Sequence, residues 1–332
     1  NRIKVSEIAS VWGKNPEEIS KSLGITEKAV AGFDEDTVTM GIEAAQNALL
    51  MAKISPQEIA AVYVGSESHP YAVNPSATII GEALGMGHDY LAADLEFACK
   101  AGTAGVQTVS GLVEAGMIDY GLAIGSDSSQ SKPHDVLEYT AGAGAAGLIL
   151  GRKKEEWLAR ILDFCSYSSD TPDFWRRDGM SYPSHQNRFT GEPAYFTHVI
   201  KASEKLLAKN KMKPTDFAYC IFHMPNGKFP QEAGKRLGFK EEQLLPSLVV
   251  KEIGNPYSAS ALLGLCKVLE IAKPDQFIFL TSYGSGAGSD SFILKTTELL
   301  TEKRKLAPGI SSYLENKKYI NYPTYLKLTK QI

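Results

Sequence analysis

Four side chains capable of chemistry stand at matching positions of two similar stretches of this chain. Cys99 lies 156 residues before Asn255, and the same offset carries Glu67 onto His223. Glu67 is therefore as far from Cys99 as His223 is from Asn255. A thiol, a carboxylate, an imidazole and an amide at equivalent points of a duplicated scaffold could assemble one reaction site with a nucleophile and a base.

The similarity extends beyond these residues, which indicates an internal repeat. Gly121–Asp127 aligns with Phe277–Tyr283 at the same offset of 156, and Thr140–Leu150 aligns with Gly284–Leu294 at an offset of 144. The difference predicts an insertion of 12 residues within Ser128–Tyr139, which we interpret as a loop. Because the order of four segments is kept, we favour a repeat over chance similarity of Gly- and Ala-rich sequence.

Each half reads as strand, helix, strand, then a glycine loop into a further strand. Residues 59–64 and 217–222 are short apolar runs of the kind found in buried strands. Apolar residues recur every three or four positions after Cys99 and after Asn255, which predicts a helix in each place. Strands that alternate with helices predict α/β layers with mostly parallel pairing.

Composition sets bounds on the class of protein. A chain of 332 residues can bury a large core, and two halves of about 150 residues fit that length. The net charge of −3 argues against a nucleic-acid partner. The sequence has no apolar run long enough to span a membrane and no secretory signal pattern, so we expect no membrane partner and a cytoplasmic location.

Neither a metal site nor a phosphate loop is predicted. The four cysteines lack metal-ligand spacing and lie in apolar segments, which is typical of a reduced intracellular chain. Three of them, Cys165, Cys220 and Cys266, are interpreted as structural. The run Gly284–Gly288 connects strand to strand without a following helix or a Lys-Ser/Thr pair, so we do not expect it to cradle phosphate.

Cys99 is the predicted nucleophile. It follows an expected strand and opens an expected helix, where unpaired N–H groups and the helix dipole favour a negative charge. This placement predicts a lowered thiol pKa and a thiolate able to attack a thioester. Its backbone N–H, together with that of Ser285, could form an oxyanion hole.

The other three groups have complementary expected roles. Glu67 ends an apolar strand, so burial should raise its pKa toward neutrality and suit it to proton transfer. His223 stands at a strand end before a turn, with His69 as a rival imidazole. Asn255 at a helix start could cap the helix, orient a water molecule or orient the imidazole.

The residues around these groups resemble the thiolase superfamily and, within it, the archaeal type of 3-hydroxy-3-methylglutaryl-CoA (HMG-CoA) synthases. The resemblance covers nearly the whole chain. The matching stretches are Val64–Pro70, Leu95–Ala104, Ser169–Arg176, Arg188–Tyr195, His223–Pro230, Ile253–Ser258, Gly284–Asp290 and Tyr313–Tyr319.

The resemblance implies a thiolase-like five-layered αβαβα fold made of two pseudo-repeated halves. It implies a homodimer and coenzyme A thioesters, acetyl-CoA and acetoacetyl-CoA, as substrates, with no tightly bound cofactor. Cys99 would carry the acetyl group, Glu67 would take a methyl proton, and His223 with Asn255 would hold and polarise the second substrate. The candidate substrate-binding residues are Lys228, Tyr257, Ser258, Gly284 and Gly286.

The chain departs from the family pattern at three points. Met224 stands where Gln is expected, Pro256 stands where Thr is expected, and the first strand of the fold is expected to be missing before Asn1. We predict an N-terminal half at 1–155, a C-terminal half at 156–297 and a surface-packed tail at 298–332. The resemblance further implies a complex with an acetoacetyl-CoA thiolase and a zinc-ribbon/OB-fold protein.

Three other functions remain open. A β-ketoacyl-ACP synthase III-like enzyme would also use Cys, His and Asn, but it condenses by decarboxylation and needs no base such as Glu67. A biosynthetic thiolase would want a second cysteine near the loop Ser282–Gly286, which has none. An inactive thiolase-fold subunit of a multienzyme assembly should have lost one of the four groups, and none is lost.

Overall fold

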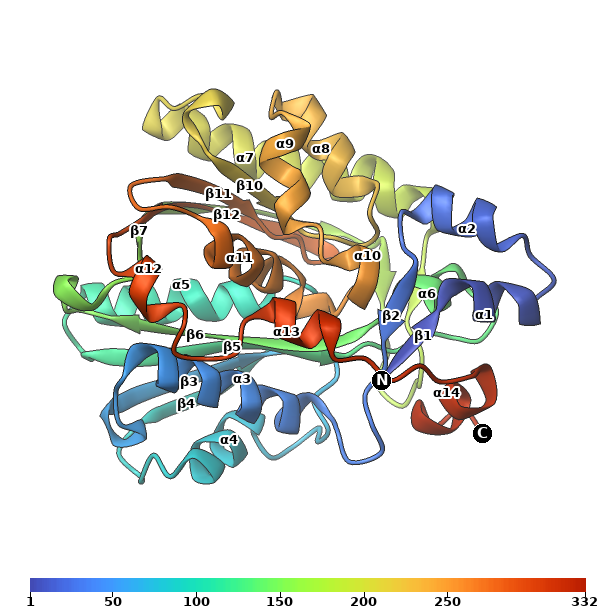
Figure 1. Ribbon diagram of the computed structural model, residues 1–332, viewed down its shortest axis with the longest axis horizontal. Helices are drawn as coiled ribbons and strands as arrows, with labels where there is room; N and C mark the ends of the chain where they lie inside the picture. Colours follow the sequence, from blue (N-terminus) through green and yellow to red (C-terminus); the bar gives the residue numbers. More distant parts are fainter.

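Two four-stranded sheets lie one above the other, with helices between them and on both outer faces (Figure 1). The computed structural model describes residues 1–332. The predicted five-layered α/β arrangement is confirmed. The first sheet has the order β4-β3-β5-β6, and the second has the order β10-β11-β12-β7.

The first sheet consists of β3 (Ile59–Gly65), β4 (Leu91–Leu95), β5 (Tyr120–Ser128) and β6 (Ala143–Gly151). The second consists of β7 (Ala159–Thr171), β10 (Tyr219–Phe222), β11 (Phe277–Thr281) and β12 (Gly286–Thr296). The predicted strands at 59–64 and 217–222 correspond to β3 and β10, although β10 begins two residues later than expected.

Three helical layers cover the two sheets (Figure 1). The layer between the sheets holds α5 (Ala101–Glu114) and α11 (Ser260–Ile271), the two helices predicted after Cys99 and Asn255. One outer layer holds α3 (Thr37–Ala52) and α4 (Ser76–Leu84). The other holds α7 (Phe196–Asn210), α8 (Phe229–Leu237) and α9 (Glu241–Leu244).

The expectation of mostly parallel pairing is wrong. β3 pairs in parallel with β4 and β5, and β10 pairs in parallel with β11, but β5–β6, β11–β12 and β12–β7 are antiparallel. The link from β11 to β12 contains no helix, and such a short connection joins only antiparallel strands. The parallel strands β3, β4 and β10 lead to Glu67, Cys99 and His223.

Small residues allow α5 to lie deep between the two halves. A Cβ atom added to Gly102 would stand 2.8 Å from the Ser258 carbonyl oxygen and 2.9 Å from Gly125 Cα. A Cβ added to Gly65 would stand 2.2 Å from the Ala101 carbonyl carbon. Backbone-to-backbone contact at these points fixes the start of α5, and hence Cys99, against the ends of β3 and β5.

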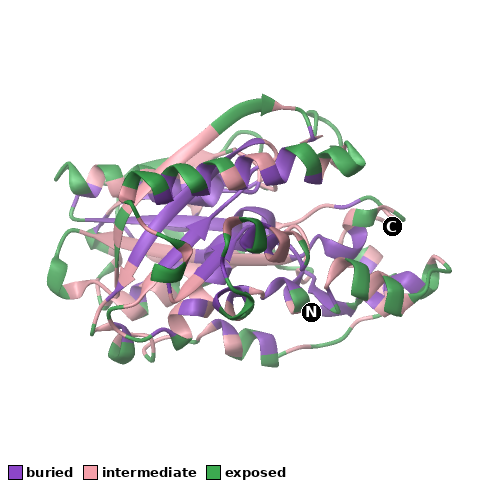
Figure 2. Ribbon diagram, turned by 90° about the horizontal axis from the view of Figure 1, so that it is seen from above, coloured by how far each residue is buried: buried purple, intermediate pink, exposed green.

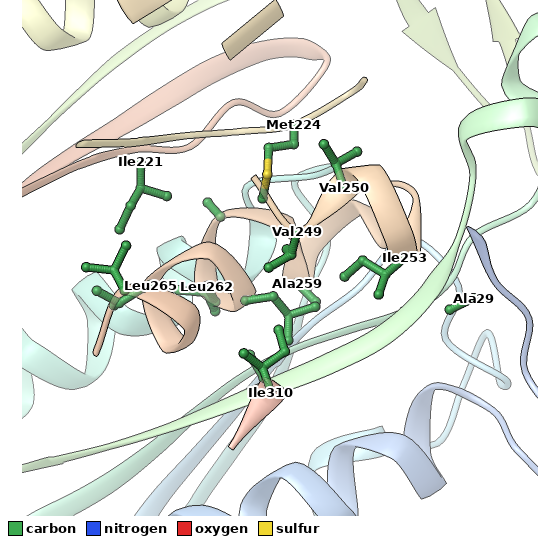
Figure 3. Packing of buried hydrophobic residues seen from close by; sticks show 14 of the residues in the cluster. Ala29, Ile221, Met224, Val249, Val250, Ile253, Ala259, Leu262, Leu265 and Ile310 are labelled. Carbon is green, nitrogen blue, oxygen red and sulfur yellow. The ribbon is translucent and has the colours of Figure 1, made fainter. Parts of the chain in front are cut away.

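The largest hydrophobic cluster contains 36 buried residues and joins both halves. Figure 3 shows Leu262 and Leu265 of α11 packed between Ile221 of β10 and Ile310 of the C-terminal tail. Buried residues are concentrated in the two sheets and the central helices, while the outer helices expose one face (Figure 2). The strands and helices that lead to the site residues therefore belong to the buried, close-packed part of the molecule.

The N-terminal residues form β1 (Arg2–Lys4), α1 (Val5–Val11), α2 (Pro16–Leu23) and β2 (Glu27–Ala29), with β1 and β2 antiparallel. This group lies against the C-terminal half, because β2 contacts α10 (Val250–Ile253). The proposed boundaries at 155 and 297 stay a prediction.

The tail forms α12 (Leu300–Lys303), α13 (Ile310–Glu315) and α14 (Tyr322–Leu328). The tail contributes to the core, since Tyr325 is 1% exposed. The Tyr322 hydroxyl donates to Glu138 Oε1 over 2.8 Å. Glu138 belongs to α6 (Val136–Thr140), a short helix at the end of the insertion that was predicted to be a loop.

Candidate active site

Glu67 and Cys99 meet because the two strands that precede them run side by side. β3 and β4 are parallel neighbours, with Gly65 opposite Leu95. Both chains leave the sheet at the same edge, and the Cys99 thiol donates a hydrogen bond to Glu67 Oε1 over 2.9 Å. The prediction that these two residues assemble is confirmed by this contact.

The backbone turns sharply at the nucleophile. Ala98 has φ of +45°, a left-handed conformation that is uncommon for a residue with a side chain. Helix α5 begins at Ala101, two residues after Cys99. Cys99 thus lies in the turn that precedes the helix.

The prediction of a lowered Cys99 pKa is wrong. Burial raises the pKa of this thiol well above its usual value, and the Glu67 carboxyl raises it further. Burial removes the water that would solvate a thiolate, and the thiol's hydrogen-bond partner is an acid rather than a cation. In the free protein the sulfur is therefore a thiol whose proton points at Glu67.

Burial raises the pKa of Glu67 to about 8, with the nearby Asp127 carboxylate acting in the same direction. The hydrogen bond from Cys99 works against this increase. The predicted shift toward neutrality is confirmed, and a carboxyl with such a pKa is suited to take up a proton and release it at physiological pH.

Asp127 is a buried carboxylate that the sequence reasoning missed. Its Oδ1 accepts hydrogen bonds from Ser66 Oγ, the Glu67 N–H and Ser68 Oγ at 2.7, 2.9 and 2.6 Å. Its Oδ2 accepts from the Ser258 N–H at 2.8 Å. Asp127 fixes the backbone of Glu67, and its place at the end of a strand next to β3 was the signal that could have revealed it.

His223 comes from the second half, at the end of β10. Its backbone N–H donates to Thr281 O over 2.9 Å, and the Tyr195 hydroxyl donates to its carbonyl oxygen over 2.8 Å. The ring is buried, and its Nδ1 has no hydrogen-bond partner. Burial lowers the pKa of His223 to about 3, so the imidazole is neutral at physiological pH.

Asn255 is buried with an unpartnered side-chain Oδ1. Its backbone N–H donates to Thr140 O over 2.6 Å. The suggestion that Asn255 caps the following helix is wrong, because α11 begins only at Ser260. Unpaired buried polar atoms on His223 and Asn255 leave hydrogen-bonding capacity for a bound molecule.

Other residues lie between Cys99 and the two predicted site residues of the second half, His223 and Asn255. Tyr257 packs in one small cluster with Cys99 and Ala141, and Ala141 forms a bridge with Asn255. The His223 ring lies 6.2 Å from the Tyr283 ring. No hydrogen bond links His223 or Asn255 directly to the Glu67–Cys99 pair.

The glycine loop between β11 and β12 lies against the turn that carries Cys99. A Cβ added to Gly284 would stand 2.5 Å from Phe97 O. The backbone N–H groups of Cys99 and Ser285 have no partner within the chain, as an oxyanion hole requires. The Gly286 N–H is occupied, because it donates to Asp173 Oδ1 over 2.7 Å.

The other predicted substrate-binding residues differ in whether their side chains already have partners within the chain. The Ser258 hydroxyl donates to Gly65 O over 2.7 Å, so it holds the two halves together. The Tyr257 hydroxyl donates to Gln130 O over 2.9 Å. Lys228 is exposed at the start of α8 and makes no ion pair. Met224 is buried and packs in the main core, which explains why an apolar side chain is tolerated there.

A small pocket opens beside Glu67. Its lining residues are Glu67, Ser68, Gln130, Arg176, Pro183 and Tyr257. The Arg176 guanidinium donates to the Glu67 carbonyl oxygen over 3.2 Å.

No group of three or more His, Cys, Asp and Glu side chains is placed to hold a metal ion. No helix combines the length and apolar character needed to cross a membrane.

Residues 207–296 match the family model described as 3-oxoacyl-[acyl-carrier-protein (ACP)] synthase III C terminal. In fold, the chain resembles MvaS in complex with 3-hydroxy-3-methylglutaryl coenzyme A, with a TM-score of 0.90 at 22% identity over 99% of this chain and 88% of that one. It also resembles 3-oxoacyl-(acyl carrier protein) synthase III of Pseudomonas aeruginosa PAO1, with a TM-score of 0.82 at 20% identity over 90% of this chain and 94% of that one.

Relatives with similar sequences identify the family more closely than the fold does. The chain is 55% identical to the hydroxymethylglutaryl-CoA synthase of Archaeoglobus fulgidus over 100% of its own length and 95% of the relative. The identity to the enzyme of the same name from Methanocaldococcus jannaschii is also 55%, again over 100% of this chain and 95% of the relative. With the Glu67–Cys99 pair in place, this full-length similarity shows that the chain belongs to the hydroxymethylglutaryl-CoA synthase family.

Proposed function

We propose that Cys99, Glu67, His223 and Asn255 condense acetyl-CoA with acetoacetyl-CoA and water to give HMG-CoA and free CoA, a reaction of the mevalonate pathway to isoprenoids. The observation that carries the proposal is the hydrogen bond between the Cys99 thiol and Glu67. It places a nucleophile for a thioester and a base for the resulting acetyl group at one point.

In the first step, the Cys99 sulfur attacks the carbonyl carbon of acetyl-CoA. The C–S bond to CoA breaks, the thiol proton passes by way of Glu67 to the leaving CoA sulfur, and an acetyl thioester forms on Cys99. The N–H groups of Cys99 and Ser285 stabilise the oxyanion of the tetrahedral intermediate.

In the second step, the Glu67 carboxylate removes a proton from the acetyl methyl group. The enolate carbon attacks the ketone carbon of acetoacetyl-CoA, the ketone π bond opens onto its oxygen, and that oxygen becomes a tertiary hydroxyl by taking up the proton that Glu67 removed from the methyl group. A neutral His223 suits this step, because an imidazole N–H can donate to that oxygen while Asn255 holds the substrate. Water then hydrolyses the thioester to Cys99, which yields a free carboxylate and restores the thiol.

Glu67 separates this proposal from a synthase III-like reaction, which gains its carbanion by losing carbon dioxide. It also argues against an inactive subunit, since the four groups are present and two of them are in contact.

In this proposal Lys228 attracts the CoA phosphates, and Tyr257, Gly284 and Gly286 contact substrate, with Ser258 as a further contact. A homodimer, a cytoplasmic location and a complex with an acetoacetyl-CoA thiolase and a zinc-ribbon/OB-fold protein belong to the proposal as well.

The test is to incubate the protein with radiolabelled acetyl-CoA and to follow acetoacetyl-CoA consumption with and without acetyl-CoA. We expect covalent label on the wild-type protein, none on Cys99→Ala, and consumption that requires acetyl-CoA. Label retained on Cys99→Ala would remove the nucleophile assignment, and release of carbon dioxide from a malonyl thioester would favour the synthase III-like reaction.

A further inference from the structure

Lys100, the residue after the nucleophile, is a buried cation. It is 4% exposed, and its ammonium contacts both carboxylate oxygens of Asp290 at 3.1 and 3.0 Å. Asp290 belongs to β12 of the second half and is fully buried. The pair therefore joins the turn that carries Cys99 to the strand that follows the glycine loop.

The Asp290 carboxylate is satisfied by further donors. Thr103 Oγ1 donates to its Oδ2 over 2.9 Å, and Ser166 Oγ donates to its Oδ1 over 2.8 Å. Because Asp290 neutralises the ammonium, Lys100 does not supply a free positive charge to the Cys99 sulfur, in agreement with the raised pKa of that thiol. We therefore do not expect Lys100 to act by stabilising a negative charge on the Cys99 sulfur.

The stem of Lys100 lies between two glycines of the second half. A Cβ added to Gly284 would stand 2.8 Å from Lys100 Cγ and 3.1 Å from its backbone nitrogen. A Cβ added to Gly288 would stand 3.1 Å from Lys100 Cε. The ammonium also lies 4.0 Å from the centre of the Phe97 ring. The lysine thus fills the space between the Cys99 turn and the glycine loop.

The Cys99 and Ser285 N–H groups stand on the two segments that Lys100 and Asp290 connect. A buried ion pair adds little net stability over apolar residues of similar size, but it imposes a defined geometry on the segments it joins. A displacement of about 1 Å in a catalytic group can cost ~10²-fold in rate.

We propose that the Lys100–Asp290 pair is a positioning device that sets the separation of the Cys99 and Ser285 N–H groups and so builds the oxyanion hole across the two halves. This inference rests on the proposed function, because it assumes that an acetyl thioester forms on Cys99.

The test is the infrared carbonyl band of the [1-¹³C]acetyl-enzyme, read together with the rate of acetylation. A well-formed oxyanion hole polarises the carbonyl and lowers its stretching frequency. In Lys100→Met we expect the band to move toward that of an acetyl thioester in water. We expect acetylation to slow by ~10²-fold or more, near the effect of losing one oxyanion donor, with little change in the KM for acetyl-CoA.

Two further variants distinguish a positioning role from misfolding and from a general effect of losing an ion pair. The double variant Lys100→Met with Asp290→Leu leaves no unpaired buried charge, so it should fold even if the single variant does not, and it should show the same shifted band. Lys317→Met is the matched control. Lys317 pairs with Glu27 and Glu252 at 2.6 and 3.0 Å and forms no hydrogen bond or ion pair with the Cys99 turn or the glycine loop, so its loss should leave the band and the acetylation rate unchanged.

The outcomes separate the two proposals. No label on the wild-type protein overturns the proposed function. A labelled wild-type protein whose folded Lys100 variants keep the wild-type band overturns the positioning role alone, whether or not their rate falls. A shifted band and slow acetylation in the Lys100 variants, with both normal in Lys317→Met, support it.

Discussion

The Cys99 thiol donates a hydrogen bond to Glu67 Oε1 over 2.9 Å, although 32 residues of chain separate the two side chains. The contact exists because β3 and β4 are parallel neighbours that release their chains at the same edge of the sheet. Two groups this close titrate as a unit, so the proton of the thiol and the proton of the carboxyl belong to the pair. In the proposed mechanism this pair acts first in acetyl transfer and then in methyl deprotonation.

Replacement of Glu67 should separate these two steps. We expect Glu67→Gln still to accept acetyl label, although more slowly than the wild type: the thiol proton loses its carrier, while removal of the carboxylate takes away a charge that raises the Cys99 pKa. Condensation should fall by ~10²- to 10⁴-fold, the usual contribution of a general base. Mass spectrometry of the acetyl-enzyme and a condensation assay measure the two steps.

Glu96→Gln is the matched control for that variant. Glu96 is exposed, and its charge acts on Glu67 without a contact to the thiol. It should acetylate and condense at close to the wild-type maximum. Full product formation by Glu67→Gln would withdraw the base assignment and revive the synthase III-like reaction.

The pH dependence of condensation follows from the Glu67 pKa of about 8. The base must be ionised, so the rate should rise with pH and should fall about tenfold per unit below the midpoint. Acetylation of Cys99 removes a hydrogen bond that lowers the Glu67 pKa, so the midpoint in the acetyl-enzyme should lie above 8. Steady-state condensation rates between about pH 6 and 10 provide the measurement.

The charge of Glu96 raises the Glu67 pKa, so Glu96→Gln should move the same midpoint downward. His223, with a pKa of about 3, should add no second limb in this range. A pH-independent condensation rate would contradict the assignment of Glu67.

Substitution of His223 should impair only the steps that involve acetoacetyl-CoA. We expect His223→Gln to form the acetyl-enzyme at a normal rate, because no hydrogen bond links the ring to the Cys99–Glu67 pair. Its KM for acetoacetyl-CoA should rise and its condensation rate should fall by ~10²-fold or more, since the ketone oxygen loses its hydrogen-bond donor.

His69 provides the comparison for His223. Its Nδ1 is already engaged with Ser76 Oγ at 2.9 Å and lies 3.3 Å from Asp94. His69→Gln should therefore retain condensation. Loss of condensation in His69→Gln with normal activity in His223→Gln would exchange the roles of the two imidazoles.

The tail should contribute stability through its buried tyrosines. Tyr322→Phe removes the hydroxyl that donates to the fully buried Glu138, so the free energy of unfolding should fall by about 1–3 kcal/mol. Tyr319 donates to Glu27 over 2.7 Å from a half-exposed position, and Tyr319→Phe should cost less. Urea unfolding of both variants checks this, and equal losses would contradict a core role for Tyr322.

The sequence by itself determined the repeat, the strand predicted at 59–64 and the central helices, and it singled out the four candidate site residues. These features depend on local patterns, because the spacing of apolar residues reports which face of a strand or helix is buried. The offset of 156 residues then indicated that Glu67, Cys99, His223 and Asn255 occupy equivalent places.

The tertiary structure decided the properties that depend on neighbours distant in sequence. The direction of the Cys99 pKa shift was predicted from a helix start, but burial and the carboxyl of Glu67 reversed it. Asp127, the Lys100–Asp290 pair and the tyrosines of the tail acquired their roles in the same way. The physical reason is that solvation and Coulomb interactions act through space, so a group's charge state is set by the side chains folded around it.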